Sequence, residues 1–205
     1  SRLVRLSGTE HARSELEQGH AVLLLSGHFP GSEIVGIHAL QSLPQMAAMY
    51  RPTNNPFADQ ILRRSRGRSL AYLIPKDGLR ELLRLLKRGV AVWYASDQAY
   101  DRKGSALVPF FGVPAMTNCA LTQIARMSKA KVLPYLPMRR ADLTGYDAVI
   151  LPALENFPTD DEVADAERVH RVLEEHIRAA PAQYYWLHRR FKNRPPPLPD
   201  VYADV

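Results

Sequence analysis

Apolar and polar positions alternate along the chain in blocks that predict strands and helices in turn. Six short, mostly apolar runs predict β-strands, at residues 21–25, 46–50, 70–74, 90–95, 131–136 and 146–151. Most of these runs lack the regular polar positions of a strand with one face in water. The sequence therefore predicts a sheet that is buried on both faces.

Between the strands lie segments with helical periodicity. Helices are predicted at residues 9–17, 31–41, 56–67, 75–89, from about 118, and 160–179. The clearest is 75–89, where leucines at 79, 82, 83 and 86 share one face and basic residues fill the last turn before Gly89. A stretch rich in Gly and Pro, residues 104–114, predicts a loop, and residues 195–199 predict an extended tail.

This alternation predicts an α/β fold with a mainly parallel central sheet flanked by helices. The length of 205 residues suffices for a substantial core, and we expect a single domain over residues 1–205. No apolar run approaches the ~18 residues of a membrane span, and no signal peptide opens the sequence. One cysteine, Cys119, rules out an internal disulfide and is expected to be a buried thiol.

Lys and Arg exceed Asp and Glu by 27 − 21 = 6 residues. This surplus suits an anionic partner, whether nucleic acid, an acidic protein or a phosphorylated lipid. The segment 186–194 carries much of it, with basic residues between aromatic ones, and it includes Arg189, Arg190, Lys192 and Arg194. No nucleic-acid motif accompanies the pattern, so we expect these four residues to contact an anionic membrane surface or water.

Candidate chemistry begins where the first buried strand ends. His28 lies on a strand-to-helix turn, and Glu33 lies in or beside the first turn of the following helix. A carboxylate close to a histidine can fix its tautomer and stabilise the imidazolium. The pair therefore has the composition of a general base and its orienting group, although such a pair is more often a surface contact. A metal would need a further ligand, so we expect no metal and no cofactor.

Two other groups of polar residues are candidates for substrate binding. Asp97 and Gln98 end the strand at 90–95, so parallel strands place them at the same sheet edge as His28, unless Asp97 only caps the next loop. Arg66 and Arg68 flank the Gly67 turn and can bind phosphate or carboxylate with two-point geometry. The neighbouring arginines at 63 and 64 are expected to be solvated.

These residues match a known pattern. The chain resembles the lipid A biosynthesis late acyltransferases, a family related to the glycerolipid acyltransferases. The resemblance is carried by ordered blocks: Gly27, His28, Phe29 and Glu33; residues 49–52 with Asn55 and Pro56; Arg66 and Arg68; residues 92–95 with Asp97; residues 108–112; Pro134; and Tyr184, residues 186–192, Arg194 and Pro195. It departs from the family at residues 30–32, which replace a common Thr-rich run.

The resemblance implies a function. His28 would be the general base and Glu33 its partner in the transfer of an acyl chain from an acyl carrier protein thioester to a hydroxyl of a lipid A precursor. The acidic carrier protein and the phosphorylated glycolipid both suit the basic chain. Members work at the cytoplasmic face of the bacterial inner membrane and begin with a membrane anchor, so we expect an anchor segment upstream of residue 1.

Three other functions remain open at this stage. A relative could acylate another lipid, such as a phosphatidylinositol mannoside, with the same histidine and acidic residue. A phosphoesterase could use His28, Glu33 and Asp97 around a metal. The chain could also be a basic membrane binder without catalytic activity. Acyl chain length, the acylated position and the choice between carrier protein and coenzyme A are not encoded in any recognisable pattern.

Overall fold

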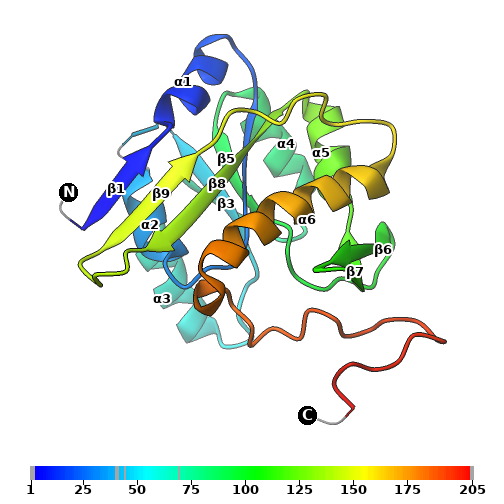
Figure 1. The fold of residues 1–205 in the computed structure, drawn as a ribbon. Coiled ribbons are helices and arrows are strands. Elements are labelled where there is room, and N and C mark those ends of the chain that lie inside the picture. The colour runs from blue at the N-terminus through cyan, green and yellow to red at the C-terminus, as the bar shows by residue number, and fades with distance from the viewer. Residues whose placement is uncertain (1–2, 40–41, 44, 69, 204–205) are drawn as a thin grey trace.

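The computed structural model describes residues 3–39, 42–43, 45–68 and 70–203. Its main sheet contains seven strands (Figure 1). Their spatial order is β1-β9-β8-β2-β5-β3-β4. The strands are β1 (Val4–Ser7), β2 (Val22–Ser26), β3 (Met46–Tyr50), β4 (Tyr72–Pro75), β5 (Ala91–Ala95), β8 (Lys131–Arg139) and β9 (Tyr146–Ile150). All neighbouring pairs are parallel except β8 and β9. The predicted α/β fold with a mainly parallel sheet is thus confirmed.

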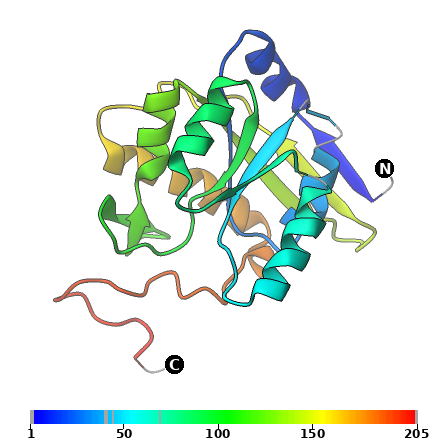
Figure 2. The ribbon, with the colours of Figure 1, turned by 180° about the vertical axis from the view of Figure 1, so that it is seen from behind.

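Helices cover both faces of this sheet. They are α1 (Thr9–Glu17), α2 (Ser32–Ala39), α3 (Pro56–Gly67), α4 (Leu79–Lys87), α5 (Ala120–Ser128) and α6 (Glu162–Ala179), followed by a 3-10 turn, η1 (Pro181–Gln183). The end predicted for the second helix, residue 41, lies outside the described residues. In Figures 1 and 2, the segment that follows α6 leads to the C-terminal stretch that runs along the lower side of the molecule.

The central strand β2 explains why its sequence has no polar alternation. Its five residues are all buried. Leu23 and Leu25 pack in the cluster that contains the buried leucines of α4 and residues of α5 and α6, whereas Val22 and Leu24 pack in a second cluster with Ala12 of α1 and Val35 of α2. Because successive side chains of a strand point to opposite faces, a sheet between two helical layers needs apolar residues at every position.

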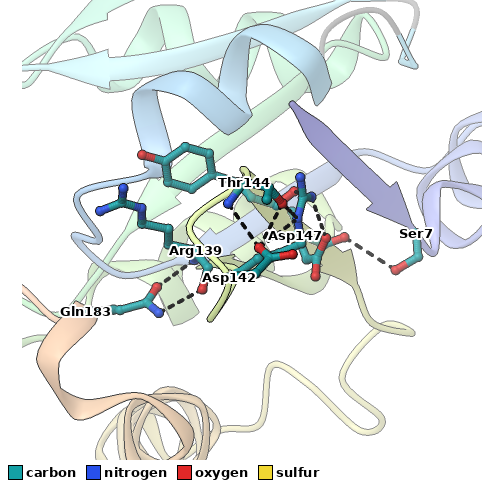
Figure 3. Close-up of polar contacts among 9 residues, drawn as sticks. Ser7, Arg139, Asp142, Thr144, Asp147 and Gln183 are labelled. Carbon is teal, nitrogen blue, oxygen red and sulfur yellow. Dashed lines mark hydrogen bonds and ion pairs between the residues drawn. The ribbon is translucent and has the colours of Figure 1, made fainter. Parts of the chain in front are cut away.

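The antiparallel pair arises from a short connection. β8 and β9 are joined by residues 140–145, too few for the crossover that parallel pairing requires, so they form a hairpin with Arg139 opposite Tyr146. Arg140 stabilises the turn, because its Nη1 donates to the Tyr146 carbonyl (2.9 Å) and to Asp147 Oδ1 (3.1 Å). Asp142 Oδ1 accepts from the Thr144 hydroxyl at 2.7 Å (Figure 3).

The loop predicted at 104–114 is wrong, because most of it forms a hairpin. Strands β6 (Ser105–Phe110) and β7 (Val113–Asn118) pair antiparallel across Phe111 and Gly112. Both turn residues have positive φ, 49° and 76°, which is the geometry of a two-residue turn that matches strand twist. Prolines 109 and 114 face each other, and a two-stranded ribbon tolerates them because both of its strands are edges. Strand β1 also has no counterpart among the predicted strands.

Candidate active site

Two neighbouring parallel strands bring the candidate residues together. β2 and β5 are paired so that Ser26 lies opposite Ala95. His28 follows Ser26 by two residues, and Asp97 follows Ala95 by two residues, so the two side chains leave the sheet at the same edge. The predicted meeting of Asp97 and His28 at this edge is found in the structure.

His28 and Asp97 form a hydrogen-bonded pair. His28 Nδ1 lies 2.6 Å from Asp97 Oδ1, and the His28 backbone N–H donates to Asp97 Oδ2 at 2.8 Å. The Tyr184 hydroxyl donates to the same Oδ2 at 2.9 Å. The Asp97 side chain is 1% exposed, whereas that of His28 is 37% exposed. Because Nδ1 is occupied by a buried carboxylate, Nε2 is the ring nitrogen left to exchange a proton with a ligand.

The turn that holds this pair leaves little room for a side chain at residue 27. A Cβ on Gly27 would lie 3.1 Å from the Phe29 ring and 3.2 Å from Asp97 Oδ2. Both distances are tighter than ordinary packing, so a side chain at residue 27 would require Phe29 or Asp97 to shift by a few tenths of an ångström. Gly27 thus allows the close approach of strand end and carboxylate.

The electrostatics favour an ionised Asp97. Burial alone would raise its pKa, but the hydrogen bonds from His28, the His28 charge and the Tyr184 hydroxyl outweigh burial and hold the pKa below its ordinary value. The pKa of Tyr184 is raised by burial and by the neighbouring Asp97 charge, so its hydroxyl stays protonated and remains a donor. The carboxylate is therefore available to stabilise an imidazolium at His28.

Glu33 has a different partner from the one that the sequence suggested. Its carboxylate forms an ion pair with Arg66 of α3, in which Arg66 Nε donates to Oε2 at 3.2 Å and Nη2 donates to Oε1. Asp97, and not Glu33, is the hydrogen-bond partner of His28 Nδ1. The expected orienting contact from Glu33 to the ring is therefore made by Asp97. A catalytic role of Glu33 stays a prediction.

His28, Glu33, Arg66 and Gln98 line one pocket of about 410 Å³ between the sheet and helices α2 and α3. This volume is typical of small-molecule sites. Apolar side chains share its walls with these polar groups: Met46, Ala48, Met49, Leu62, Leu70 and Trp93. Arg68 does not line the pocket and is exposed at the end of α3, so the structure separates it from Arg66.

Three polar groups in the pocket wall have no hydrogen-bond partner among the described residues. They are Ser32 Oγ, Trp93 Nε1 and the Tyr135 hydroxyl. An unpaired buried polar group is costly, and such groups in native proteins call for an explanation such as a bound ligand or water. All three can donate a hydrogen bond to a ligand oxygen.

The segment after α6 holds the site together from outside the sheet. Gln183 anchors it to β8, because its amide accepts from the Arg139 N–H at 2.6 Å and donates to the Arg139 carbonyl at 2.9 Å (Figure 3). The Tyr185 N–H donates to the His28 carbonyl at 3.2 Å. His188 Nε2 accepts from the Ala99 N–H at 2.9 Å. Tyr184 was not predicted to belong to the site. Its presence among the residues that match the family pattern was the only feature of the sequence that pointed to it.

The expected contact between Arg190 and a membrane surface is wrong, because Arg190 is 1% exposed. Its Nη1 donates to the Met116 carbonyl (2.8 Å), and its Nη2 donates to Thr117 Oγ1 (2.7 Å) and lies 3.0 Å from His170 Nε2. Burial lowers the pKa of His170 to about 4, so this ring is neutral and can accept a hydrogen bond. Arg190 thus joins the C-terminal segment to β7 and α6. Arg189 is exposed, and Lys192 and Arg194 are half-buried.

We expect Arg190→Ala to lower the free energy of unfolding by roughly 2–4 kcal/mol, because it removes several charge-assisted hydrogen bonds and leaves buried partners unpaired. Arg189→Ala is the matched control and should change it by less than about 0.5 kcal/mol. Urea unfolding of both variants at neutral pH measures the difference. Equal, small effects would contradict a structural role for Arg190.

Among the described residues, no group of three or more His, Cys, Asp or Glu side chains is arranged to hold a metal ion. Within the same part of the chain, no helix combines the length and hydropathy needed to cross a bilayer.

Comparison with known proteins agrees with the fold and identifies the family. At the level of structure, the chain is similar to the crystal structure of the 1-acyl-sn-glycerophosphate (LPA) acyltransferase PlsC from Thermotoga maritima, with a TM-score of 0.52 and 15% identity, over 87% of this chain and 72% of that one. This likeness concerns the fold.

Sequence relatives are much more similar. The lipid A biosynthesis palmitoleoyltransferase of Escherichia coli K12 is 37% identical over 191 residues, which cover 93% of this chain and 62% of the relative. The lauroyltransferase of the same strain is 36% identical over 203 residues, which cover 98% and 66%. The chain thus spans less than two thirds of the length of these relatives. The sequence profile of the bacterial lipid A biosynthesis acyltransferases matches residues 1–193, and the chain belongs to this family.

Proposed function

We propose that this chain carries the catalytic centre of an acyltransferase that moves a fatty acyl chain from a thioester to a hydroxyl of a lipid A precursor, with His28 as the general base. The observation that carries the proposal is the His28 Nδ1–Asp97 contact at 2.6 Å, which leaves Nε2 available at a pocket that His28 lines together with several apolar side chains. The family membership supports the choice of reaction.

The chemistry needs a base because a lipid hydroxyl has a pKa far above 7. His28 Nε2 takes the hydroxyl proton as the oxygen attacks the thioester carbonyl, and a tetrahedral intermediate forms. Asp97 stabilises the resulting imidazolium. When the C–S bond breaks, the imidazolium returns the proton to the sulfur, so the carrier leaves as a thiol. Attack is direct, and no acyl-enzyme is needed.

The developing oxyanion needs donors in the same pocket. Arg66 is a cation in the pocket wall, and Ser32 is the first residue of α2, where backbone N–H groups and the helix dipole favour negative charge. Glu33 holds the Arg66 side chain through its ion pair. In this proposal Glu33 acts through Arg66, and Asp97 acts through His28.

The acyl chain fits the apolar part of the pocket, and the partners fit the charge of the chain. An acyl carrier protein is acidic and a lipid A precursor is phosphorylated, so both are attracted to a protein with a net charge of +6. Trp186 and Leu187 are exposed beside the cation of Arg189, a combination suited to an anionic membrane surface. We place the reaction at the cytoplasmic face of the inner membrane.

The decisive experiment expresses the gene in a Gram-negative strain that lacks its late acyltransferases and measures lipid A by mass spectrometry. The proposal expects a new species heavier by one acyl group, and none with the His28→Ala variant. A stable, expressed wild-type protein that leaves lipid A unchanged contradicts the proposal. Acylation of another lipid, such as a phosphatidylinositol mannoside, would agree with the proposed acyl transfer but would show that the acceptor is not a lipid A precursor.

Among the arginines of α3, we expect only Arg66 to be important for transfer. Arg66→Ala should lower kcat/KM by about 10–150-fold, equivalent to one charge-assisted contact of ~1.5–3 kcal/mol. Arg66→Lys should recover little, because the lysine ammonium lacks the two-point geometry of the guanidinium. Steady-state transfer at fixed salt measures both variants.

Arg63→Ala, Arg64→Ala and Arg68→Ala are the controls, since these three side chains are exposed and outside the pocket. They should be nearly silent. Equal losses for all four alanine variants would instead indicate that the arginines attract substrate by their summed charge.

A further inference from the structure

The pocket extends away from His28 along strand β3. Tyr50 and Arg51 line it at the end of β3 nearest His28, and Ala48 and Met46 line it further back. From Tyr50 to Met46 a strand covers about 13 Å. Met46 is 1% exposed, and Leu70 lines the pocket beside it, because the Ala71 N–H donates to the Met46 carbonyl. Apolar side chains from Met46 and Leu70 therefore line the end of the pocket far from His28.

Gly36 lines this pocket from the opposite side, in the middle of α2. It lies four residues after Ser32, which is one helical turn further from the helix start. A Cβ built on Gly36 would meet no heavy atom within 4 Å. Its φ is not in the left-handed region, so neither backbone geometry nor close packing requires glycine here.

Glycine is a poor helix former, so an unneeded glycine in the middle of a helix destabilises that helix. What Gly36 provides is open space inside the pocket wall. Ala48 adds to this space from β3, because its side chain is also small and also lines the pocket. The open space at Gly36 thus lies one helical turn beyond Ser32.

We propose that Gly36 is a specificity-determining residue: its missing side chain leaves room for the distal part of the acyl chain, and Met46 and Leu70 limit the length that fits. This inference rests on the proposed function, because it takes the occupant of the pocket to be the acyl chain of the donor. The apolar side chains of Met46, Ala48 and Leu70 and the continuity of the pocket with His28 favour that occupant.

The test compares Gly36→Leu with Gly67→Leu. Gly67 is the matched control because it is also helical, also has no heavy atom within 4 Å of a built Cβ, and does not line this pocket. Transfer is measured for a series of saturated acyl thioesters that differ by two carbons. Gly36→Leu should lower kcat/KM about 10–200-fold for the longest chain that the wild type uses well, and should spare the shortest. Gly67→Leu should leave the chain-length profile unchanged.

A uniform loss over all chain lengths, or an unchanged profile for Gly36→Leu, would overturn the inference. Gly36→Ala checks the fold, since it should keep or raise the melting temperature and shift the profile less than leucine does. Binding of free saturated fatty acids of the same lengths, measured by calorimetry, gives a readout without turnover. If the wild type transfers no acyl group, the proposed function fails, whereas the length dependence of fatty-acid binding still decides the role of Gly36.

Discussion

Replacing His28 with alanine is expected to lower acyl transfer by ~10²–10⁴-fold, the range in which general base catalysis contributes. The variant keeps the pocket but has no group that can take the hydroxyl proton. The fold should be little affected, because the His28 side chain is 37% exposed and its backbone N–H can still donate to Asp97. Single-turnover transfer from an acyl carrier protein thioester measures the chemical step directly.

His11→Ala is the control, since His11 belongs to α1 and does not line the pocket. It should transfer like the wild type. A folded His28→Ala variant with more than about one tenth of wild-type activity would show that another group takes the proton, and general base catalysis by His28 would be abandoned.

The sheet could be predicted from the sequence because a strand buried on both faces has a distinct pattern. The run at 21–25 has no polar position, and β2 lies at the centre of the sheet. The β6–β7 hairpin escaped prediction because two prolines and a glycine are typical of loops. Its prolines are tolerated only because both strands are edges, which is a property of the tertiary structure.

The candidate site could be predicted in part for a related reason. The rule that parallel strands end at one sheet edge places Asp97 near His28 without any knowledge of side-chain geometry. It does not decide which carboxylate contacts the ring. Glu33 is close to His28 in sequence, but its carboxylate pairs with Arg66 of α3. Asp97, which follows the neighbouring strand β5, makes the contact with the His28 ring.

Tyr184 and Arg190 show where sequence reasoning ends. Tyr184 contacts a carboxylate 87 residues away, and no local pattern encodes such a contact. Arginine is almost never fully buried unless it is paired, so a basic segment is reasonably interpreted as a surface. The partners of Arg190 come from β7 and α6, and only the packed structure reveals that they surround it.

Replacing Asp97 with asparagine is expected to be nearly as damaging as the loss of His28, with transfer reduced by ~10²–10⁴-fold. An amide can donate to Nδ1 and so hold the ring in the tautomer whose Nε2 already carries a proton, which disables the base. It also removes the charge that stabilises the imidazolium. Transfer assays of Asp97→Asn and Glu33→Gln should be run side by side, because Glu33 contacts Arg66 rather than the ring.

The stability of Asp97→Asn provides a check that does not depend on activity. The folded-state pKa of Asp97 lies below its ordinary value, so the carboxylate stabilises the fold at neutral pH, and this stabilisation is lost as the pH falls through that pKa. The difference in unfolding free energy between wild type and Asp97→Asn should therefore be largest at neutral pH and shrink in acid. Urea unfolding at a series of pH values measures it. If Glu33→Gln costs more transfer than Asp97→Asn, or if the stability difference is independent of pH, Asp97 is not the ionised group that orients His28.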